Sequence, residues 1–153
     1  MDNEGYSQMT IESISHITLI VQDLERASAL LSSVLGAKVV YDSGEEMFSL
    51  SKERFFLVGS VWVAIMEGNP LSERTYNHIA FKIPESEYED YKERLKTAGV
   101  DFRQGRTRIH GEGLSLYFHD YDNHLFELHT GTLEERLHTY ETKAKSKKGQ
   151  PTN

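Results

Sequence analysis

The chain has 153 residues, a formal net charge of −7 and no cysteine. This length is sufficient for one domain with a sizeable hydrophobic core, or for two small modules that share a core. The acidic charge argues against nucleic acid and anionic membrane surfaces as partners, because both require a basic face. The lack of cysteine excludes disulfides, thiolate metal ligands and a cysteine nucleophile.

Both ends of the chain are predicted to be disordered. Residues 1–10 show no apolar periodicity, and residues 143–153 form a basic, polar tail that contains Gly and Pro. No apolar run reaches the length of a membrane span, and the polar, acidic N-terminus does not resemble a signal peptide. We therefore expect a cytoplasmic protein with one folded domain over residues 11–142.

The domain nearly repeats itself. The segments SHITLIVQDLERASALLSSVLGAKVVY, from Ser15, and NHIAFKIPESEYEDYKERLKTAGVDFR, from Asn77, each predict a strand, an amphipathic helix and a second strand. Further strand-like runs follow in both halves: Phe48–Leu50, Phe55–Val58, Trp62–Met66, Leu114–Phe118 and Leu125–His129. Because a duplication constrains the whole fold, it predicts an α+β protein of two βαβββ modules, about residues 14–68 and 76–132.

Turn and capping signals delimit the remaining elements. Gly36 and Gly99 stand where a left-handed helix end is usual. The stretch EGNPLSERT, residues 67–75, contains the turn signal Asn-Pro and separates the modules. A C-terminal helix is predicted over residues 133–142, because Thr132 and Glu135 have the spacing of a capping box.

Strand alternation places several polar side chains on sheet faces that the helices cannot cover. His16 lies opposite the apolar residues of the first strand, and His78 holds the matching place in the second module. The uncovered faces share enough polar residues to form a polar cup: His16, Thr18, His78, Ser115, Tyr117 and Glu127.

Two histidines at matching places in a repeat, together with a strand-borne carboxylate, make a 2-His-1-carboxylate set. Such a set suits a divalent first-row metal with open positions for water and substrate. The alternative is an ordinary polar face exposed to solvent. The repeat places Ile65, which cannot ligate, near the position equivalent to Glu127, and His129 lies one step beyond Glu127, where it could support a ligand by hydrogen bonding.

The paired modules, with SHITLIV, NHIAFKI and HLFELHTGTLEERL, resemble the vicinal oxygen chelate (glyoxalase) superfamily. Within it, YNHIAF, EGLSLYFHDYDNHLFELHTGTLEERL and FSLSKERFFLVG resemble the fosfomycin-resistance epoxide hydrolases of the FosX type. The resemblance covers about residues 14–140. It implies a cup-shaped mixed sheet in a domain-swapped homodimer whose active sites are shared between the two chains.

The resemblance also implies roles for individual residues. His16 from one chain and His78 and Glu127 from the other would bind Mn²⁺, and Glu53 matches the general base. Glu53 would activate water to open the fosfomycin epoxide, which gives the vicinal diol and antibiotic resistance. The remaining matches line the fosfomycin site or neighbour its phosphonate: Thr18, Trp62, Arg108, Ser115, Tyr117 and Arg136.

The residues themselves leave simpler readings and other functions open. Glu53 between Lys52 and Arg54 is common in a solvated turn, and Trp62 suits a β-sheet core. A metal-dependent transferase could open fosfomycin with glutathione or another thiol, although RIHGEGLS departs from the potassium-binding loop of related transferases. A metal-free dimer that sequesters the antibiotic would need no ligand triad, and an extradiol dioxygenase would normally use iron.

Overall fold

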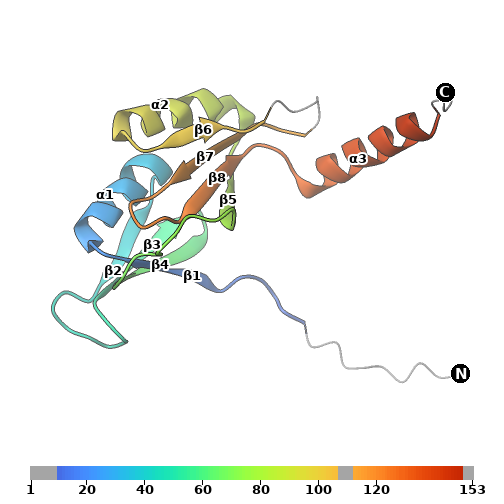
Figure 1. The fold of residues 1–153 in the computed structure, drawn as a ribbon. Coiled ribbons are helices and arrows are strands. Elements are labelled where there is room, and N and C mark those ends of the chain that lie inside the picture. The colour runs from blue at the N-terminus through green and yellow to red at the C-terminus, as the bar shows by residue number, and fades with distance from the viewer. Residues whose placement is uncertain (1–9, 107–111, 150–153) are drawn as a thin grey trace, which may run out of the picture.

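The computed structural model describes residues 10–106 and 112–149, whose elements form two similar halves (Figure 1). The first half contains β1 (His16–Val21), α1 (Leu24–Leu35), β2 (Lys38–Asp42), β3 (Glu53–Val58) and β4 (Val61–Glu67). The second half contains β5 (His78–Lys82), a 3-10 turn η1 (Glu85–Glu87), α2 (Tyr88–Ala98), β6 (Phe102–Gln104), β7 (Ser115–His119) and β8 (Leu125–His129), and α3 (Leu133–Lys148) follows it. The predicted α+β fold of two βαβββ modules is confirmed.

Each half forms its own four-stranded mixed sheet, and the two sheets have the same topology. The strand orders are β1-β4-β3-β2 and β5-β8-β7-β6. In both sheets the first and last strands of the module run parallel, and the other neighbours run antiparallel. His16 lies opposite Trp62 in the first sheet, and His78 lies opposite Leu125 in the second. The sequence repeat is therefore a structural repeat in which the two histidines hold the same place.

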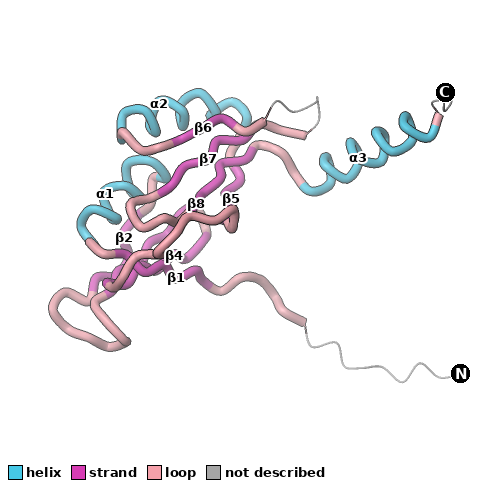
Figure 2. The backbone as a smooth tube through the Cα atoms, viewed as in Figure 1, coloured by secondary structure: helices cyan, strands magenta, loops and turns pink. Residues whose placement is uncertain are grey.

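Helices α1 and α2 lie side by side and cover one side of the sheets (Figures 1 and 2). In β1, Leu19 and Val21 are buried beneath them, whereas His16 and Thr18 on the opposite face are exposed. Burial of one large apolar side chain stabilises the fold by about 1.5–3 kcal/mol, and α1 contributes a continuous apolar stripe to this core: Leu24, Ala27, Leu30, Leu31, Val34 and Leu35. The helices thus leave the predicted cup faces uncovered.

The predicted ends of both module helices are confirmed. Gly36 ends α1 with a φ of 62°, and Gly99 ends α2 with a φ of 68°. A left-handed conformation at these positions is accessible to Gly without the steric cost of a Cβ. Both glycines let the chain reverse into the following strand.

The predicted strand Phe48–Leu50 is wrong. These residues belong to the connection between β2 and β3, and Phe48 and Leu50 are 73% and 89% exposed. Ser43 closes the hairpin from the other side, because its backbone N–H donates to the Glu53 carbonyl and its Oγ accepts from the Glu53 N–H. Pairing therefore begins at Glu53, and the apolar residues before it have no strand to join.

Helix α3 is longer than predicted, because it ends at Lys148 rather than near Thr142. Residues 143–148, which were predicted to be disordered, are therefore helical. No Gly or Pro interrupts the helix before Gly149, and the Glu141–Lys145 ion pair stabilises its last turns. The lysines of the last turn interact favourably with the negative end of the helix dipole. The predicted disordered residues 1–9 and 150–153 lie outside the described part of the chain. No helix of the described residues is both long and apolar enough to cross a membrane.

Candidate metal centre and active site

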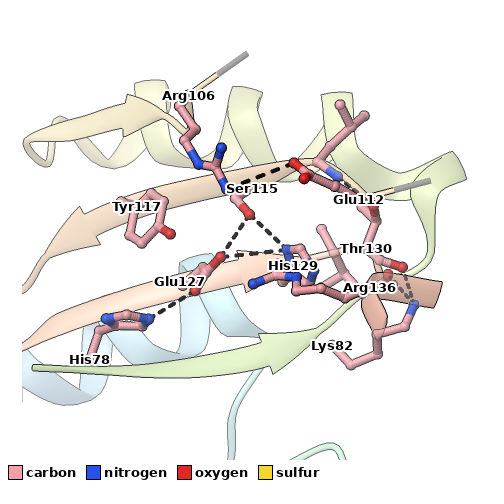
Figure 3. Close-up of polar contacts among 12 residues, drawn as sticks. His78, Lys82, Arg106, Glu112, Ser115, Tyr117, Glu127, His129, Thr130 and Arg136 are labelled. Atoms are coloured by element: carbon pink, nitrogen blue, oxygen red, sulfur yellow. Dashed lines mark hydrogen bonds and ion pairs between the residues drawn. The ribbon is translucent and has the colours of Figure 1, made fainter. Parts of the chain in front are cut away.

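The candidate site lies on the uncovered face of the second sheet (Figure 3). Glu127 of β8 lies between Ala80 of β5 and Tyr117 of β7 in the strand register. The next row of the same face places His129 beside Ser115. Directly paired residues share one face of a sheet, so these polar side chains converge as the alternation predicted.

His78 lies against Glu127 at the start of β5. Its Nε2 is 3.0 Å from Glu127 Oε2, and its Nδ1 is 2.7 Å from the backbone carbonyl oxygen of Tyr76. Because a carbonyl can only accept a hydrogen bond, Nδ1 carries a hydrogen, and in the neutral ring Nε2 keeps its lone pair. That lone pair faces a carboxylate oxygen. The pair therefore needs a proton or a cation between its two atoms.

This arrangement fits a divalent metal. Two ligand atoms that each lie about 2.1 Å from a metal, at about 90° to one another, are about 3.0 Å apart. The Tyr76 carbonyl holds the His78 ring in the tautomer that a metal requires, as is usual for ligating histidines. His78 and Glu127 thus have the donor chemistry, spacing and orientation of two metal ligands.

The third predicted ligand, His16, belongs to the other sheet. Its ring packs against Trp62 at a tilt of 33° with ring centroids 4.3 Å apart, and its Nδ1 is 3.0 Å from Ser15 Oγ. Within residues 10–106 and 112–149, no three His, Asp or Glu side chains lie together as a metal-binding group. One copy of the described chain therefore supplies two of the three predicted ligands at one place.

Glu127 is buried and strongly hydrogen-bonded. Burial raises the pKa of its carboxyl, but hydrogen bonds from Ser115 and Tyr117 and the nearby imidazoles of His129 and His78 outweigh burial and lower the pKa below its usual value. The same surroundings, led by burial and a hydrogen bond with Tyr76, raise the pKa of the Tyr117 hydroxyl. Glu127 is thus held as a carboxylate beside a neutral tyrosine.

A chain of hydrogen bonds runs from Glu127 to helix α3 (Figure 3). Arg136 NH2 lies 3.2 Å from His129 Nε2, and His129 Nδ1 lies 2.7 Å from Ser115 Oγ, which donates to Glu127 Oε1 at 2.7 Å. Arginine can only donate, so His129 Nε2 accepts and its Nδ1–H donates to Ser115. Every donor in the chain therefore points toward the candidate metal ligand.

Glu53 lies on the uncovered face of the first sheet. It pairs with Met66 of β4, and Met66 pairs with Ile20 of β1, so these three residues form one row across the sheet. Thr18 lies in the next row of the same face, nearer to His16. Its side chain is half-buried, and Ser43 holds both of its backbone polar groups. The structure therefore places Glu53 on the same face as Thr18 and His16, but on a different sheet from His78 and Glu127.

The position equivalent to Glu127 is Ala64, not Ile65. His16 lies opposite Trp62, and His78 lies opposite Leu125, so the residue two further along is Ala64 in one sheet and Glu127 in the other. Ile65 faces the helices and is fully buried. A shift of one residue turns a side chain to the other face. Like Ile65, Ala64 cannot ligate a metal.

The predicted substrate contacts divide between the two sheets. Thr18 and Trp62 lie on the first sheet with His16, and Phe55 packs edge-on against Trp62 at 5.1 Å between ring centroids. Ser115, Tyr117 and Arg136 lie around Glu127, as described above. Arg108 lies outside the described residues.

A polar pocket of about 260 Å³ adjoins Tyr117, and two of its residues, Tyr76 and Arg103, were missed by the sequence patterns. Tyr76 brings its hydroxyl to 3.3 Å from the Tyr117 hydroxyl, and Arg103 pairs with Tyr117 across β6 and β7. Arg106 also lines this pocket. The position of Tyr76 directly before the His78 strand was the available signal. A larger pocket of about 570 Å³ lies around Arg54, away from these residues.

Comparison with known proteins places the chain in a family. Residues 13–128 match the model of the Glyoxalase/Bleomycin resistance protein/Dioxygenase superfamily. The chain is 58% identical over 127 residues to the fosfomycin resistance protein FosX of Mesorhizobium japonicum. This match covers 83% of this chain and 91% of the relative. It is 55% identical over 130 residues to FosX of Listeria monocytogenes, which spans 85% and 98%.

A more distant relative and a solved structure complete the comparison. The metallothiol transferase FosB of Staphylococcus saprophyticus is 37% identical over 134 residues, 85% of this chain and 84% of FosB. A crystal structure of mutant Listeria monocytogenes FosX, complexed with Mn(II) and 1S,2S-dihydroxypropylphosphonic acid, matches with a TM-score of 0.77 and 52% identity over 86% of this chain and 99% of that chain. This chain therefore belongs to the Glyoxalase/Bleomycin resistance protein/Dioxygenase superfamily and, within it, to the family of FosX proteins.

Proposed function

We propose that this chain catalyses Mn²⁺-dependent hydrolysis of the epoxide of fosfomycin to the vicinal diol, and so confers resistance to the antibiotic. The observation that carries the proposal is the His78–Glu127 pair, in which the lone pair of His78 Nε2 faces Glu127 Oε2 at 3.0 Å. The pair occurs in a chain that is 58% identical to a FosX protein. The diol phosphonate bound with Mn(II) in the related crystal structure has the chemistry of the proposed product.

The complete metal site is proposed to form in a homodimer. His16 of one chain would join His78 and Glu127 of the other, because the described residues of one chain do not bring the three together. The face around His16 also exposes apolar side chains that a second sheet could cover, including Ile14, Ile20 and Leu57. A domain-swapped pair, with the first sheet of one chain facing the second sheet of the other, would satisfy both observations.

In the proposed reaction, Glu53 accepts a proton from water while the water oxygen forms a bond to a ring carbon of the epoxide. The bond between that carbon and the epoxide oxygen breaks, and the oxygen gains a proton to give the diol. When bound, Mn²⁺ supplies Lewis-acid stabilisation of the negative charge that develops on this oxygen. General-base catalysis of this kind contributes about 10²–10⁴ in rate.

The remaining side chains hold the substrate. Fosfomycin is a small epoxide with a phosphonate, and a phosphonate is best held by guanidinium groups. Arg136 is proposed to fill this role, with Arg103 and Arg106 in the pocket beside Tyr117 as further cations. Trp62 and Thr18 would form the opposite wall from the first sheet of the partner chain.

The test is incubation of purified protein with fosfomycin and Mn²⁺ in ¹⁸O-labelled water, with and without glutathione, followed by mass spectrometry. We expect a diol that carries ¹⁸O on a carbon of the opened ring, that forms without thiol and that disappears on chelation. A thiol adduct in place of the diol would instead assign a transferase like FosB. Tight binding of fosfomycin without any product would indicate sequestration. Expression with a fluorescent tag would test the cytoplasmic location that we propose.

A further inference from the structure

Helix α3 makes few contacts with the other described residues. None of its residues is buried, and it extends away from the two sheets (Figure 1). In the described part of the chain, two of its side chains form hydrogen bonds or ion pairs beyond the helix and its N-cap. Arg136 reaches His129, and Lys143 reaches Glu112. The orientation of α3 therefore depends on polar contacts rather than on a hydrophobic core.

Glu112 is an unusual partner for a surface helix. It is only 1% exposed, and its carboxylate lies in the interior just before β7. Lys143 Nζ lies 2.5 Å from Glu112 Oε1, and Arg106 NH2 lies 3.8 Å from Oε2. Burial of a carboxylate costs desolvation free energy, which cations and hydrogen bonds offset. The positions of α3 in which Lys143 reaches Glu112 are therefore strongly stabilised.

The backbone around Glu112 is locked to the segment from which α3 begins. Thr130 Oγ1 accepts from the Leu114 N–H, and the Thr130 N–H donates to the Leu114 carbonyl. Gly113, with a φ of 81°, packs on Gly131 so closely that a Cβ would lie 2.6 Å from the Gly131 nitrogen. Glu112 is thus a fixed point relative to the start of α3.

The two contacts lie on one side of α3. Arg136 and Lys143 are seven residues apart, which is about two turns of an α-helix, so their side chains project in nearly the same direction. One contact near the helix start leaves the direction of the helix free, whereas a second contact two turns later on the same side restricts that direction. Lys143 therefore restricts where the Arg136 guanidinium can lie.

We propose that Glu112 and Lys143 form a positioning pair that holds α3 so that Arg136 reaches the candidate site. Arg136 is in turn connected through His129 and Ser115 to Glu127 (Figure 3). Neither Glu112 nor Lys143 belongs to the proposed substrate contacts. The inference rests on the proposed role of Arg136 in holding the phosphonate, and it assigns to Lys143 an effect on substrate affinity rather than on the chemical step.

The first test replaces Lys143 with methionine, which keeps an unbranched chain but removes the charge. We expect KM for fosfomycin to rise about tenfold with kcat within about threefold of wild type, because a phosphonate contact is weakened while the base and metal ligands are untouched. Lys143→Arg should restore most of the affinity. Lys145→Met is the matched control: it removes an equivalent charge from an exposed pair with Glu141, and its KM should equal that of wild type.

A double-mutant cycle separates positioning from a general structural effect. In an Arg136→Gln background, Lys143→Met should change KM by less than about twofold, because the group that it positions is gone. An equal rise of KM in both backgrounds, or a wild-type KM in Lys143→Met, would overturn the inference. Because loss of a buried partner can impair folding, Glu112→Gln/Lys143→Met, which buries no unpaired charge, should show the same rise.

Failure of the proposed function would have a different signature. If wild-type protein with Mn²⁺ formed no diol, the epoxide hydrolase assignment would fail. The same cycle would then be measured as equilibrium binding of fosfomycin by calorimetry. A Kd that rises with Lys143→Met only when Arg136 is present would still support the positioning pair, and a Kd that does not change would overturn it.

Discussion

The two sheets have the same strand order and a histidine at the same place, yet their uncovered faces differ. On the second sheet, Glu127 and Ser115 are buried in a hydrogen-bonded network that includes His129. On the first sheet, His16 and Thr18 are exposed to solvent. The polar groups of the second face are thus hydrogen-bonded to one another within a single chain, whereas those of the first face point into solvent.

Equivalent positions show how the two faces have diverged. The register matches Ala64 to Glu127, Phe55 to Tyr117 and Glu53 to Ser115. The second face therefore carries the proposed carboxylate ligand with its hydrogen-bond donors, whereas the first carries an aromatic wall and the proposed base. This division is what the proposed dimer requires, because there one face of each kind would lie opposite the other.

The largest expected effect comes from removing the carboxylate that distinguishes the second face. Glu127→Ala should abolish tight Mn²⁺ binding and reduce hydrolysis by about 10³-fold or more, because a metal ligand and its charge are lost together. His78→Ala should behave in the same way. Ala64→Ser, at the equivalent place on the first face, should bind Mn²⁺ normally. Isothermal titration with Mn²⁺ and a fosfomycin assay would measure both, and full activity of metal-stripped protein would refute the metal site.

The next effect concerns the carboxylate of the first face. Glu53→Gln keeps the shape of the side chain but cannot accept a proton, so hydrolysis should fall by about 10²–10⁴-fold. Mn²⁺ affinity should change little, because the three proposed ligands His16, His78 and Glu127 are untouched. Glu45→Gln, on the exposed loop before β3, is the control and should retain wild-type rates. Near-wild-type hydrolysis by Glu53→Gln would return Glu53 to the role of a hairpin residue.

Opposition of the two faces can be tested by mixing inactive proteins. His16→Ala damages the first face and Glu127→Ala the second, so a hybrid dimer would contain one site with both faces intact. Random exchange of subunits should restore about a quarter of wild-type activity per chain, because half of the dimers are hybrids and one of their two sites works. Exchange would be followed by mass spectrometry of intact dimers. Hybrids without activity would show that each site is built within one chain.

The division between the faces was partly predictable from the sequence. The period-2 alternation of the strands and the duplicated segments are local signals, and they were sufficient to place His16, His78 and Glu127 on the uncovered faces. The equivalent of Glu127 was misplaced at Ile65, because a register error of one residue exchanges the faces. The equivalence depends on the register between β1 and β4, which are far apart in the sequence, so no local pattern encodes it.

Other features depend on contacts between distant segments. Glu112 stands in a glycine-rich stretch that reads as an exposed loop, and its burial follows from the close packing of Gly113 on Gly131. Phe48 and Leu50 have the composition of a strand, but the Ser43–Glu53 pairing leaves them outside the sheet. Composition reports what a residue prefers, whereas these outcomes depend on which partner is available.

The smallest expected effect on activity comes from replacing Arg54, whose side chain lies on the helix-covered side of the first sheet. It neighbours the proposed base but points to the opposite side, where it donates to Ser28 Oγ, Asp42 and Glu25 and so links α1 to β2. Arg54→Met should lower the free energy of unfolding by about 1 kcal/mol through lost hydrogen bonds, with kcat and KM near wild type.

The Arg54 guanidinium lowers the pKa of Glu25 from its ordinary 4.5. A lowered carboxyl pKa stabilises the fold above the unfolded-state value and ceases to do so as pH falls through the folded-state value, so the difference from wild type should shrink below about pH 4.5. Urea unfolding at pH 7 and pH 3.5 would measure it, and a large loss of kcat without a loss of stability would show that Arg54 acts in the site.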